Sequence, residues 1–457
     1  MTNVIEIPVW FAVLAGIFAA VALLDKLLLP SVRWFFRKRF TRAVERLNTK
    51  LQLQIQPFKL TRRKALIDQL SYDPVIMQAV AAEAAESGEP IEVVAERATR
   101  YAREIVPHFS AFAYFGFAAR AARWLSQSLY RVRLGLLDEQ AMAEVDKDST
   151  VVFVMNHRSN MDYVLVTYLA SERSALSYAV GEWARVWPLQ GFIRSMGAYF
   201  IRRKSRNPLY RCVLARYVQL ATEGGVAQAI FPEGGLSRTG HLGEAKLGLL
   251  SYIVKGFNVE GPRDVVFVPV GLNYDRVLED RVLLAARDAD GKKQFSSGAG
   301  SVFGFIGHQL WLRITGKYHR FGYACVSFGK PVSLKRFLAK TEGELEAQIA
   351  TLGDDLMEKI AGVVPVLPVS LISSIMLKAE SLSMIGIKGA AHKRLKDYAA
   401  RGIYSHIPHA DEDYAVDVGL RMLTMRHILL EEDGIFRVNP ENRDVLEYYA
   451  NAIAHLG

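Results

Sequence analysis

Five short runs rich in β-branched and aromatic residues constrain the fold of this chain more than any other feature. The segments between them carry apolar residues at helical spacing. Strands that alternate with helices form a sheet covered by helices, so this part of the chain is predicted to be an α/β domain, a mixed sheet flanked by helices. The runs lie at residues 151–155, 199–202, 226–231, 265–272 and 323–328.

Helical patterns occupy both sides of this domain. The chain has 457 residues, 51% of them hydrophobic, which suffices for two or three structural units. We expect an N-terminal helical subdomain at 31–145, the α/β domain at 146–345 and a C-terminal helical region at 346–457. An apolar stretch at 361–377 is interrupted by prolines, so it is not assigned as a membrane span. The clearest helices of the subdomain are predicted at residues 74–86 and 92–105.

Residues 1–30 are predicted to form one N-terminal membrane helix that anchors the chain. Residues 7–24 are apolar or small without interruption, about the length that crosses a bilayer. Several basic residues follow this run, whereas the only charged residue before it is Glu6. This distribution of charge predicts that the amino terminus lies outside and the bulk of the chain on the cytoplasmic side of the inner membrane. Asp25 and Pro30 shorten the apolar run, so a helix lying on the membrane or buried in a core remains an alternative.

The charge and the cysteine content narrow the class of partner. The formal net charge of +10 suits an anionic membrane surface, phosphorylated or acidic substrates, or nucleic acid. No motif that recognises RNA or DNA occurs, so a nucleic-acid partner is not predicted. Cys212 and Cys325 lie far apart and outside any C-x-x-C motif, which excludes a disulfide framework and predicts no metal site. We expect two thiols in a reducing compartment.

The sequence NHRSNMD at 156–162 follows the first predicted strand directly. A histidine at the carboxyl end of a strand lies where α/β sheets build their sites. Its imidazole takes up a proton near neutral pH, and a carboxylate on the other ring nitrogen would fix its tautomer. Asp162 is the natural partner of His157. A spacing of five does not put two side chains on one helix face, so their pairing requires His157 to lie at or before the helix start.

Two further segments carry groups that suit phosphate. GAYFIRR at 197–203 ends in Arg202 and Arg203, whose planar guanidinium groups would bind phosphate through paired hydrogen bonds. A solvated charge run or a patch for lipid headgroups remains the alternative. FPEGGLSR at 231–238 is a glycine-rich turn whose backbone N–H groups can approach an anion, with Ser237 and Arg238 as added donors.

Two other functions, nucleotide binding and serine-dependent hydrolysis, are excluded because the motifs they require are absent. A phosphate-binding loop of the Walker A type would require Lys and Ser or Thr where His241 and Leu242 stand. A nucleophilic-serine hydrolase would require G-x-S-x-G, which does not occur.

Residues 289–300 are predicted to form a mobile flap because they are rich in Gly, Lys and Ser. The apolar helix at 247–253 is predicted to be core, with an acyl tunnel as the alternative.

Four blocks in this order resemble the glycerol-3-phosphate acyltransferase family, within the glycerolipid acyltransferases defined by H-x-x-x-x-D. They are NHRSNMD at 156–162, GAYFIRR at 197–203, FPEGGLSR at 231–238 and VPVGLNYDRV at 268–277. Residues 446–455 look like the carboxyl-terminal signature of the larger, bacterial-type members, so the resemblance extends from about residue 60 to the end. The smaller lysophosphatidate acyltransferases share the blocks but lack this tail.

The resemblance implies a glycerolipid acyltransferase-like core that moves a fatty acyl group from acyl-CoA or acyl carrier protein to glycerol 3-phosphate near membrane lipid, with no cofactor and no metal. It implies His157 as general base and Asp162 as its partner, with Arg158 as a further phosphate or donor contact. Leu236 stands where many members have Arg, so lysophosphatidate or dihydroxyacetone phosphate remains an alternative acceptor. A catalytically silent membrane scaffold remains the alternative of a different class. The implied phosphate and glycerol pocket consists of Arg202, Arg203, Glu233, Gly234, Gly235, Ser237 and Arg238, shaped by Pro269.

Overall fold

The computed structural model describes part of the chain. The chain divides into two compact units, Met1–Gln54 and Ile55–Gly457. The first unit lies outside the described residues, and with it the whole of the predicted membrane helix at 1–30; the predicted flap at 289–300 lies outside them as well. The described residues are 58, 61, 63–109, 114, 119–170, 176–181, 191, 193–194, 197–202, 205–288 and 320–457.

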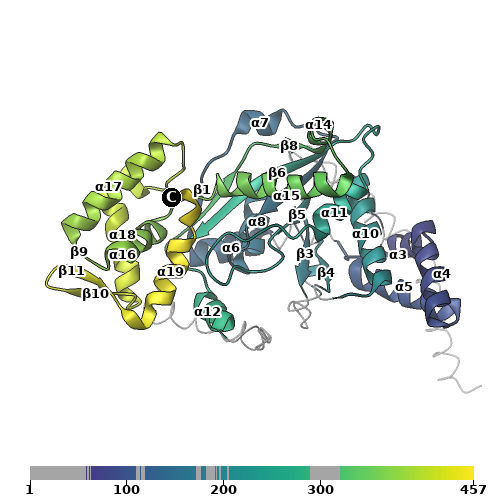
Figure 1. Ribbon diagram of the computed structural model, residues 1–457, viewed down its shortest axis with the longest axis horizontal. Coiled ribbons are helices and arrows are strands. Elements are labelled where there is room, and N and C mark those ends of the chain that lie inside the picture. The colour runs from purple at the N-terminus through teal and green to yellow at the C-terminus, as the bar shows by residue number, and fades with distance from the viewer. Residues whose placement is uncertain are drawn as a thin grey trace, which may run out of the picture. The chain divides into compact units, whose positions relative to one another are not determined.

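An eight-stranded mixed sheet forms the centre of the second unit (Figure 1). Strands β6, β2, β5, β3 and β4 run parallel to one another, whereas β7 and β8 each pair antiparallel with β6, and β1 pairs parallel with β7. All five predicted strands are present, which confirms the mixed α/β class. In spatial order the strands are β1 (Arg131–Leu134), β7 (Tyr323–Phe328), β6 (Val265–Tyr274), β2 (Thr150–Met155), β5 (Gln228–Ile230), β3 (Ser177–Gly181) and β4 (Tyr199–Ile201), with β8 (Val332–Ser333) beside β6.

The central strands were predictable because helices cover the sheet on both faces. Every residue of β2 and of β6 is buried, as expected for continuous apolar runs in a parallel sheet. Val152 and Val154 point into a large hydrophobic cluster with apolar residues of helices on that face. These helices are α3 (Arg63–Ser71), α4 (Pro74–Ser87), α5 (Ile91–Ile105), α10 (Pro208–Glu223), α11 (Gly248–Lys255) and α15 (Leu345–Ala361).

Helices α4 and α5 confirm the two helices predicted for the N-terminal subdomain. Helix α4 begins after Asp73, whose carboxylate accepts the N–H of Val75, and ends at Gly88, whose φ of 70° is the left-handed conformation that glycine favours. In α11 the residues Leu250 and Ile253 are buried in the same cluster, so the helix at 247–253 belongs to the core as predicted. The remaining helices of this half are α6 (Ala119–Leu129), α7 (Glu139–Ala143), α8 (Met161–Ala170), α12 (Asp280–Asp288) and α14 (Leu334–Lys340).

The range 31–145, predicted as the N-terminal helical subdomain, also contains strand β1. This strand, Arg131–Leu134, lies in that range and yet pairs with β7 in the central sheet. It has charged residues at alternate positions and is mostly exposed, so no apolar run marks it. Its stability comes from a ladder with residues almost two hundred positions away, which local patterns do not reveal.

The C-terminal region is mainly helical, with helices α16 (Pro368–Ala379), α17 (Met384–Ala400), α18 (Glu412–Met425) and α19 (Arg443–Asn451). The predicted helical region also contains three strands that form an antiparallel sheet: β10 (Leu429–Glu432), β11 (Ile435–Val438) and β9 (Ser381–Ser383). The turn between β10 and β11 is Asp433-Gly434, both with positive φ, a pair typical of tight hairpins. Short 3₁₀ helices occur at Pro408–Ala410, Pro440–Asn442 and Ala454–Leu456.

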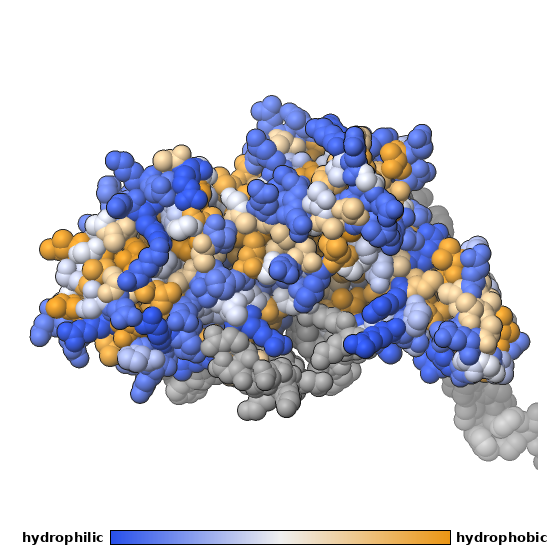
Figure 2. All heavy atoms as spheres, viewed as in Figure 1, coloured by the Kyte–Doolittle hydropathy of each residue, from blue (hydrophilic) through white to orange (hydrophobic). Residues whose placement is uncertain are grey.

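Helix α16 occupies most of the apolar stretch at 361–377 and is buried along most of its length. Within the ranges that the structure describes, none of the helices is both long and apolar enough to cross a bilayer. The viewed face of the molecule is largely hydrophilic, with apolar residues scattered among the polar ones (Figure 2). Cys212 and Cys325 are both free thiols, as predicted; burial raises the pKa of Cys325 to about 12.

Candidate active site

Three neighbouring parallel strands bring the polar residues of three sequence blocks together. His157 lies two residues after the end of β2, and Glu233 lies three residues after the end of the adjacent β5. Tyr274 is the last residue of β6, on the other side of β2. Because the carboxyl ends of parallel strands meet at one edge of a sheet, side chains far apart in sequence become neighbours there.

His157 and Asp162 form a buried pair at this edge. The distance from His157 Nδ1 to Asp162 Oδ2 is 2.9 Å, and the two side chains are 1% and 0% exposed. Helix α8 begins at Met161, so His157 precedes the helix and Asp162 lies in its first turn, the arrangement that the spacing of five requires. An ionised carboxylate only accepts hydrogen bonds, so Nδ1 donates and the basic lone pair of the ring lies on Nε2.

Backbone and side-chain donors fix the carboxylate of Asp162. Its Oδ2 also accepts the N–H groups of Arg158, at 2.7 Å, and Ser159, at 3.0 Å. Its Oδ1 accepts the hydroxyl of Tyr274 at 2.6 Å. Burial, and the adjacent charge of Asp162, raise the pKa of Tyr274 well above its ordinary value, so this hydroxyl remains a donor. Asp162 is therefore held in a single orientation toward the imidazole.

Two aromatic rings and the loop after β5 hold His157 itself. Its imidazole stacks on Phe231, with ring centres 4.1 Å apart, and meets the edge of Tyr163 at 5.4 Å. Its N–H donates to Glu233 Oε1 at 2.8 Å, and its carbonyl accepts the N–H of Ser237 at 3.0 Å. Both backbone groups of the histidine are thus bound by the third sequence block.

The third block builds a closed loop next to His157. Glu233 Oε2 accepts the N–H of Gly243 at 3.0 Å; burial raises the pKa of Glu233, while the N–H groups of His157 and Gly243 lower it. Ser237 Oγ donates to the carbonyl of His241 at 2.7 Å. Gly234 has a φ of +66°, which favours glycine. The structure places Gly235 and Leu236 half-buried in this loop and leaves Arg238 exposed.

The arginines of the second block are not gathered with this loop. Arg202 donates from Nε and Nη2 to the two carboxylate oxygens of Glu104, at 2.8 and 2.6 Å, and its guanidinium lies 5.4 Å from the rings of Tyr101 and Tyr210. A phosphate would have to compete with this bidentate ion pair. Arg203 lies outside the described residues. The roles of both arginines stay predictions.

Sequence reasoning missed several residues that support the site. Tyr274 stands inside the fourth block, but its bond to Asp162 spans 112 positions and has no local signal. Glu279 accepts the hydroxyl of Ser159 at 2.7 Å and the N–H of Asn160 at 3.2 Å, and burial raises its pKa while the Ser159 bond lowers it. An acidic residue shortly after the fourth block was the available signal.

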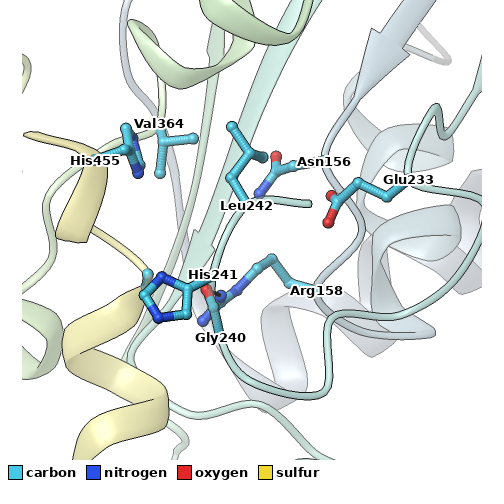
Figure 3. A pocket seen from close by; sticks show the side chains of 9 residues that line it. Asn156, Arg158, Glu233, Gly240, His241, Leu242, Val364 and His455 are labelled. Atoms are coloured by element: carbon cyan, nitrogen blue, oxygen red, sulfur yellow. Dashed lines mark hydrogen bonds between the residues drawn. The ribbon is translucent and has the colours of Figure 1, made fainter. Parts of the chain in front are cut away.

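The C-terminal helix α19 packs directly on the loops that follow β2 and β5. The guanidinium of Arg158 lies 4.9 Å from the ring of Tyr448, and one of its N–H groups donates to the carbonyl of Gly240. Asn451 Nδ2 donates to the carbonyl of Thr239 at 2.9 Å. A cavity of about 10 Å³ remains between these segments (Figure 3). It is lined by Asn156, Arg158, Glu233, Gly240, His241, Leu242, Val364, Ala452 and His455.

Within the described part of the chain, no group of three or more His, Cys, Asp or Glu side chains is arranged to hold a metal ion. The buried pair of His157 and Asp162 can accept a proton from a bound hydroxyl group and stabilise the resulting imidazolium. Residues 137–273, which carry this pair, match the family model described as Acyltransferase. The fold and the site therefore define an acyltransferase domain.

The rest of the chain matches a more specific description. Residues 311–456 match the glycerol-3-phosphate acyltransferase C-terminal region. The glycerol-3-phosphate acyltransferase of Ectopseudomonas mendocina is 28% identical over 425 residues, which cover 87% of this chain and 49% of that protein. The enzyme of the same description from Xylella fastidiosa is 27% identical over 423 residues, covering 87% and 47%. In both matched regions the chain is therefore similar to glycerol-3-phosphate acyltransferases, and it spans about half the length of the curated relatives it matches.

A solved structure shows a weaker likeness. The 1-acyl-sn-glycerophosphate (LPA) acyltransferase of Thermotoga maritima is 18% identical, with a TM-score of 0.32, and the match covers 65% of this chain and 97% of that one.

Proposed function

We propose that this chain transfers a fatty acyl group from a thioester, acyl-CoA or acyl carrier protein, to glycerol 3-phosphate and so forms lysophosphatidate. The observation that carries the proposal is the buried pair of His157 and Asp162 at the carboxyl edge of β2. Its carboxylate is held by two backbone N–H groups and by Tyr274. The similarity to glycerol-3-phosphate acyltransferases supports the same reaction.

The proposed mechanism is direct transfer without an acyl-enzyme. His157 Nε2 removes the proton of the acceptor hydroxyl while that oxygen attacks the thioester carbonyl, and Asp162 stabilises the imidazolium. The tetrahedral intermediate collapses, the C–S bond breaks, and the imidazolium returns its proton to the leaving thiolate. General-base assistance contributes about 10²–10⁴-fold, so holding the two substrates together must supply most of the remaining acceleration.

The acceptor phosphate is proposed to lie near the loop at 231–243, which binds both backbone groups of His157. Ser237 and the exposed Arg238 belong to this loop. A net charge of +10 favours association with anionic acceptors and with either donor. We also propose that residues 1–30 anchor the chain in the inner membrane, with the catalytic domain on the cytoplasmic side. The proposal includes no cofactor, metal or nucleic acid.

Lysophosphatidate is the second candidate acceptor. Leu236, half-buried in the third block, stands where the family resemblance leads one to expect an arginine in many members that use glycerol 3-phosphate. Replacing a cation by an apolar side chain weakens the case for a small, highly charged acceptor and suits one that carries an acyl chain. The chemistry at His157 would be the same for both acceptors.

The test compares acceptors and donors side by side. The purified protein in detergent is given palmitoyl-CoA or palmitoylated acyl carrier protein, with glycerol 3-phosphate, lysophosphatidate or dihydroxyacetone phosphate, and the lipid product is quantified. We expect product formation that depends on glycerol 3-phosphate. Turnover with lysophosphatidate alone would move the enzyme to the second acylation. Absence of turnover with every pair, in a folded protein, would favour the silent scaffold.

A further inference from the structure

A buried ion pair connects the C-terminal helices to the start of α12, which lies beside α19 (Figure 1). Arg426, directly after α18, donates from Nη2 to Asp280 Oδ2 at 2.6 Å, and the two side chains are only 13% and 5% exposed. The hydroxyl of Tyr449, on α19, donates to the same oxygen at 2.5 Å and accepts a hydrogen bond from Arg426 Nη1 at 3.0 Å. Burial, and the charge of Asp280, raise the pKa of Tyr449, so its hydroxyl keeps the proton that it donates. These three residues are called the α12 cluster.

The α12 cluster also holds the segment between β6 and α12. The Tyr449 hydroxyl accepts a second hydrogen bond, from the N–H of Val277 at 3.0 Å, and Val277 is buried. Asp280 is the first residue of α12, so its side chain ties the other end of the segment to the same tyrosine. The C-terminal helices therefore fix the chain at positions 277 and 280, and Glu279 lies between these two points.

Glu279 extends this connection to the turn between His157 and Asp162. Its Oε2 accepts the hydroxyl of Ser159 at 2.7 Å, and its Oε1 accepts the N–H of Asn160 at 3.2 Å. The N–H of Ser159 in turn donates to Asp162 Oδ2, the same oxygen that contacts His157 Nδ1. A continuous series of hydrogen bonds and short backbone segments therefore runs from the C-terminal helices to the pair of His157 and Asp162.

The negative charge of Glu279 is costly where it lies. Burial raises the pKa of Glu279, the bonds from Ser159 and Asn160 lower it, and the charge of Asp162 raises it. The donors described for its carboxylate are a hydroxyl and an amide group, both neutral, so neither offsets the cost with a positive charge. Perturbed carboxyl groups of this kind gather at functional sites, where a second negative charge beside Asp162 favours an imidazolium.

We propose that Glu279 is a positioning residue for His157 and Asp162: it holds the turn that pairs them and stabilises the imidazolium of His157 through its negative charge. The proposal rests on the proposed function, because it concerns the base of that reaction. Glu279 acts through the turn and contacts neither substrate. Its own position is set by the α12 cluster, so the C-terminal helices contribute to the geometry of the base without supplying a group that reacts.

The test measures acyl transfer from palmitoyl-CoA to glycerol 3-phosphate by the full chain across pH, with denaturant unfolding in parallel. Glu279→Gln removes the charge and keeps the size of the side chain. Without this charge the imidazolium is less stable, so the acid limb of the pH–rate profile should move to lower pH by up to about one unit. The value of kcat should fall about fivefold or more, with KM within about twofold of the parent.

Arg426→Met tests the α12 cluster at a distance from the turn. It should lower kcat about threefold or more with little change in KM, and Arg426→Lys, which can still pair with Asp280, should recover part of the loss. The matched control is Arg216→Met, because Arg216 also forms a partly buried ion pair, with Asp73 at 2.8 Å. Asp73 precedes α4, and the control should lose stability while it keeps the kcat and the acid limb of the parent.

An acid limb and a kcat of Glu279→Gln that match those of the parent would overturn the role of Glu279 and leave the proposed function standing. Equal kcat values in Arg426→Met and Arg216→Met would overturn the role of the α12 cluster. If Glu279→Gln does not fold, the kcat values of Arg426→Met and Arg426→Lys decide the matter.

Failure of the proposed function would be recognised separately. If the parent turns over none of the acceptors, the ring of His157 is titrated by NMR, with its signal assigned by its loss in His157→Ala. A titration midpoint that moves to lower pH in Glu279→Gln would keep the role of Glu279 although the reaction is another one. An unchanged midpoint would overturn the inference as well.

Discussion

Replacing Tyr274 with phenylalanine isolates a single hydrogen bond to the carboxylate that orients His157. The Tyr274 hydroxyl lies 2.6 Å from Asp162 Oδ1, and both residues are fully buried. Phenylalanine keeps the ring and its packing but leaves Oδ1 without this donor. A hydrogen bond to a charged group contributes about 1.5–3 kcal/mol, so the free energy of unfolding should fall by about this amount.

The pH–rate profile of Tyr274→Phe should also change, which a loss of stability alone would not cause. Without the Tyr274 donor, the charge of Asp162 is drawn more strongly toward His157 Nδ1, which favours the imidazolium. The acid limb of the pH–rate profile should move to higher pH by up to about one unit, equivalent to about 1.4 kcal/mol. The value of kcat should fall by about tenfold. The bonds from Arg158 and Ser159 remain, so activity should not be abolished.

The assay combines pH–rate profiles with denaturant unfolding of Tyr274→Phe and of a matched control. Tyr199 is also a buried tyrosine, but its hydroxyl has no hydrogen-bond partner among the described residues, so Tyr199→Phe should leave stability unchanged or slightly higher. Equal losses of stability in the two variants, together with an acid limb of Tyr274→Phe that coincides with that of the parent, would contradict this prediction.

Two further substitutions test the packing of the tail and a buried carboxyl. Gly240→Ala should destabilise the protein by more than about 2 kcal/mol, because φ is +86° and the new Cβ would collide with the carbonyl of Tyr448; Gly402→Ala, with a φ of +71° and open space, is the control for denaturant unfolding. Burial raises the pKa of Asp275 from 3.8 to about 7. The folded state therefore binds the extra proton between these values, so the stability of the parent relative to Asp275→Asn should fall as pH rises from about 4 to 7. Unfolding curves with equal pH slopes would contradict this.

Apolar runs made the centre of the sheet predictable. Strands β2 and β6 are buried on both faces, so their β-branched residues form continuous runs that a sequence reveals. The same logic placed His157 at the end of a strand, and the spacing to Asp162 then required the loop geometry that the structure has. Strand β1 escaped prediction because its partner, β7, lies far away in the sequence.

The sequence did not reveal which side chains from distant segments contact each other. Arg202 looked like a phosphate ligand because it ends a strand among other cations, yet it pairs with Glu104 on α5. Tyr274 and Tyr448 looked like parts of sequence signatures, and only the fold shows that they contact Asp162 and Arg158. The Asp433-Gly434 hairpin, by contrast, carried a clear local signal that the helical interpretation of the tail overlooked.

The central claim is that His157 acts as the general base. Its direct test is the kcat of His157→Ala for acyl transfer from palmitoyl-CoA to glycerol 3-phosphate, with His392→Ala as control because that histidine is exposed on α17. We expect a loss of about 10²–10⁴-fold for His157→Ala in a folded protein, and full activity for His392→Ala. Activity of His157→Ala within about tenfold of the parent would contradict it.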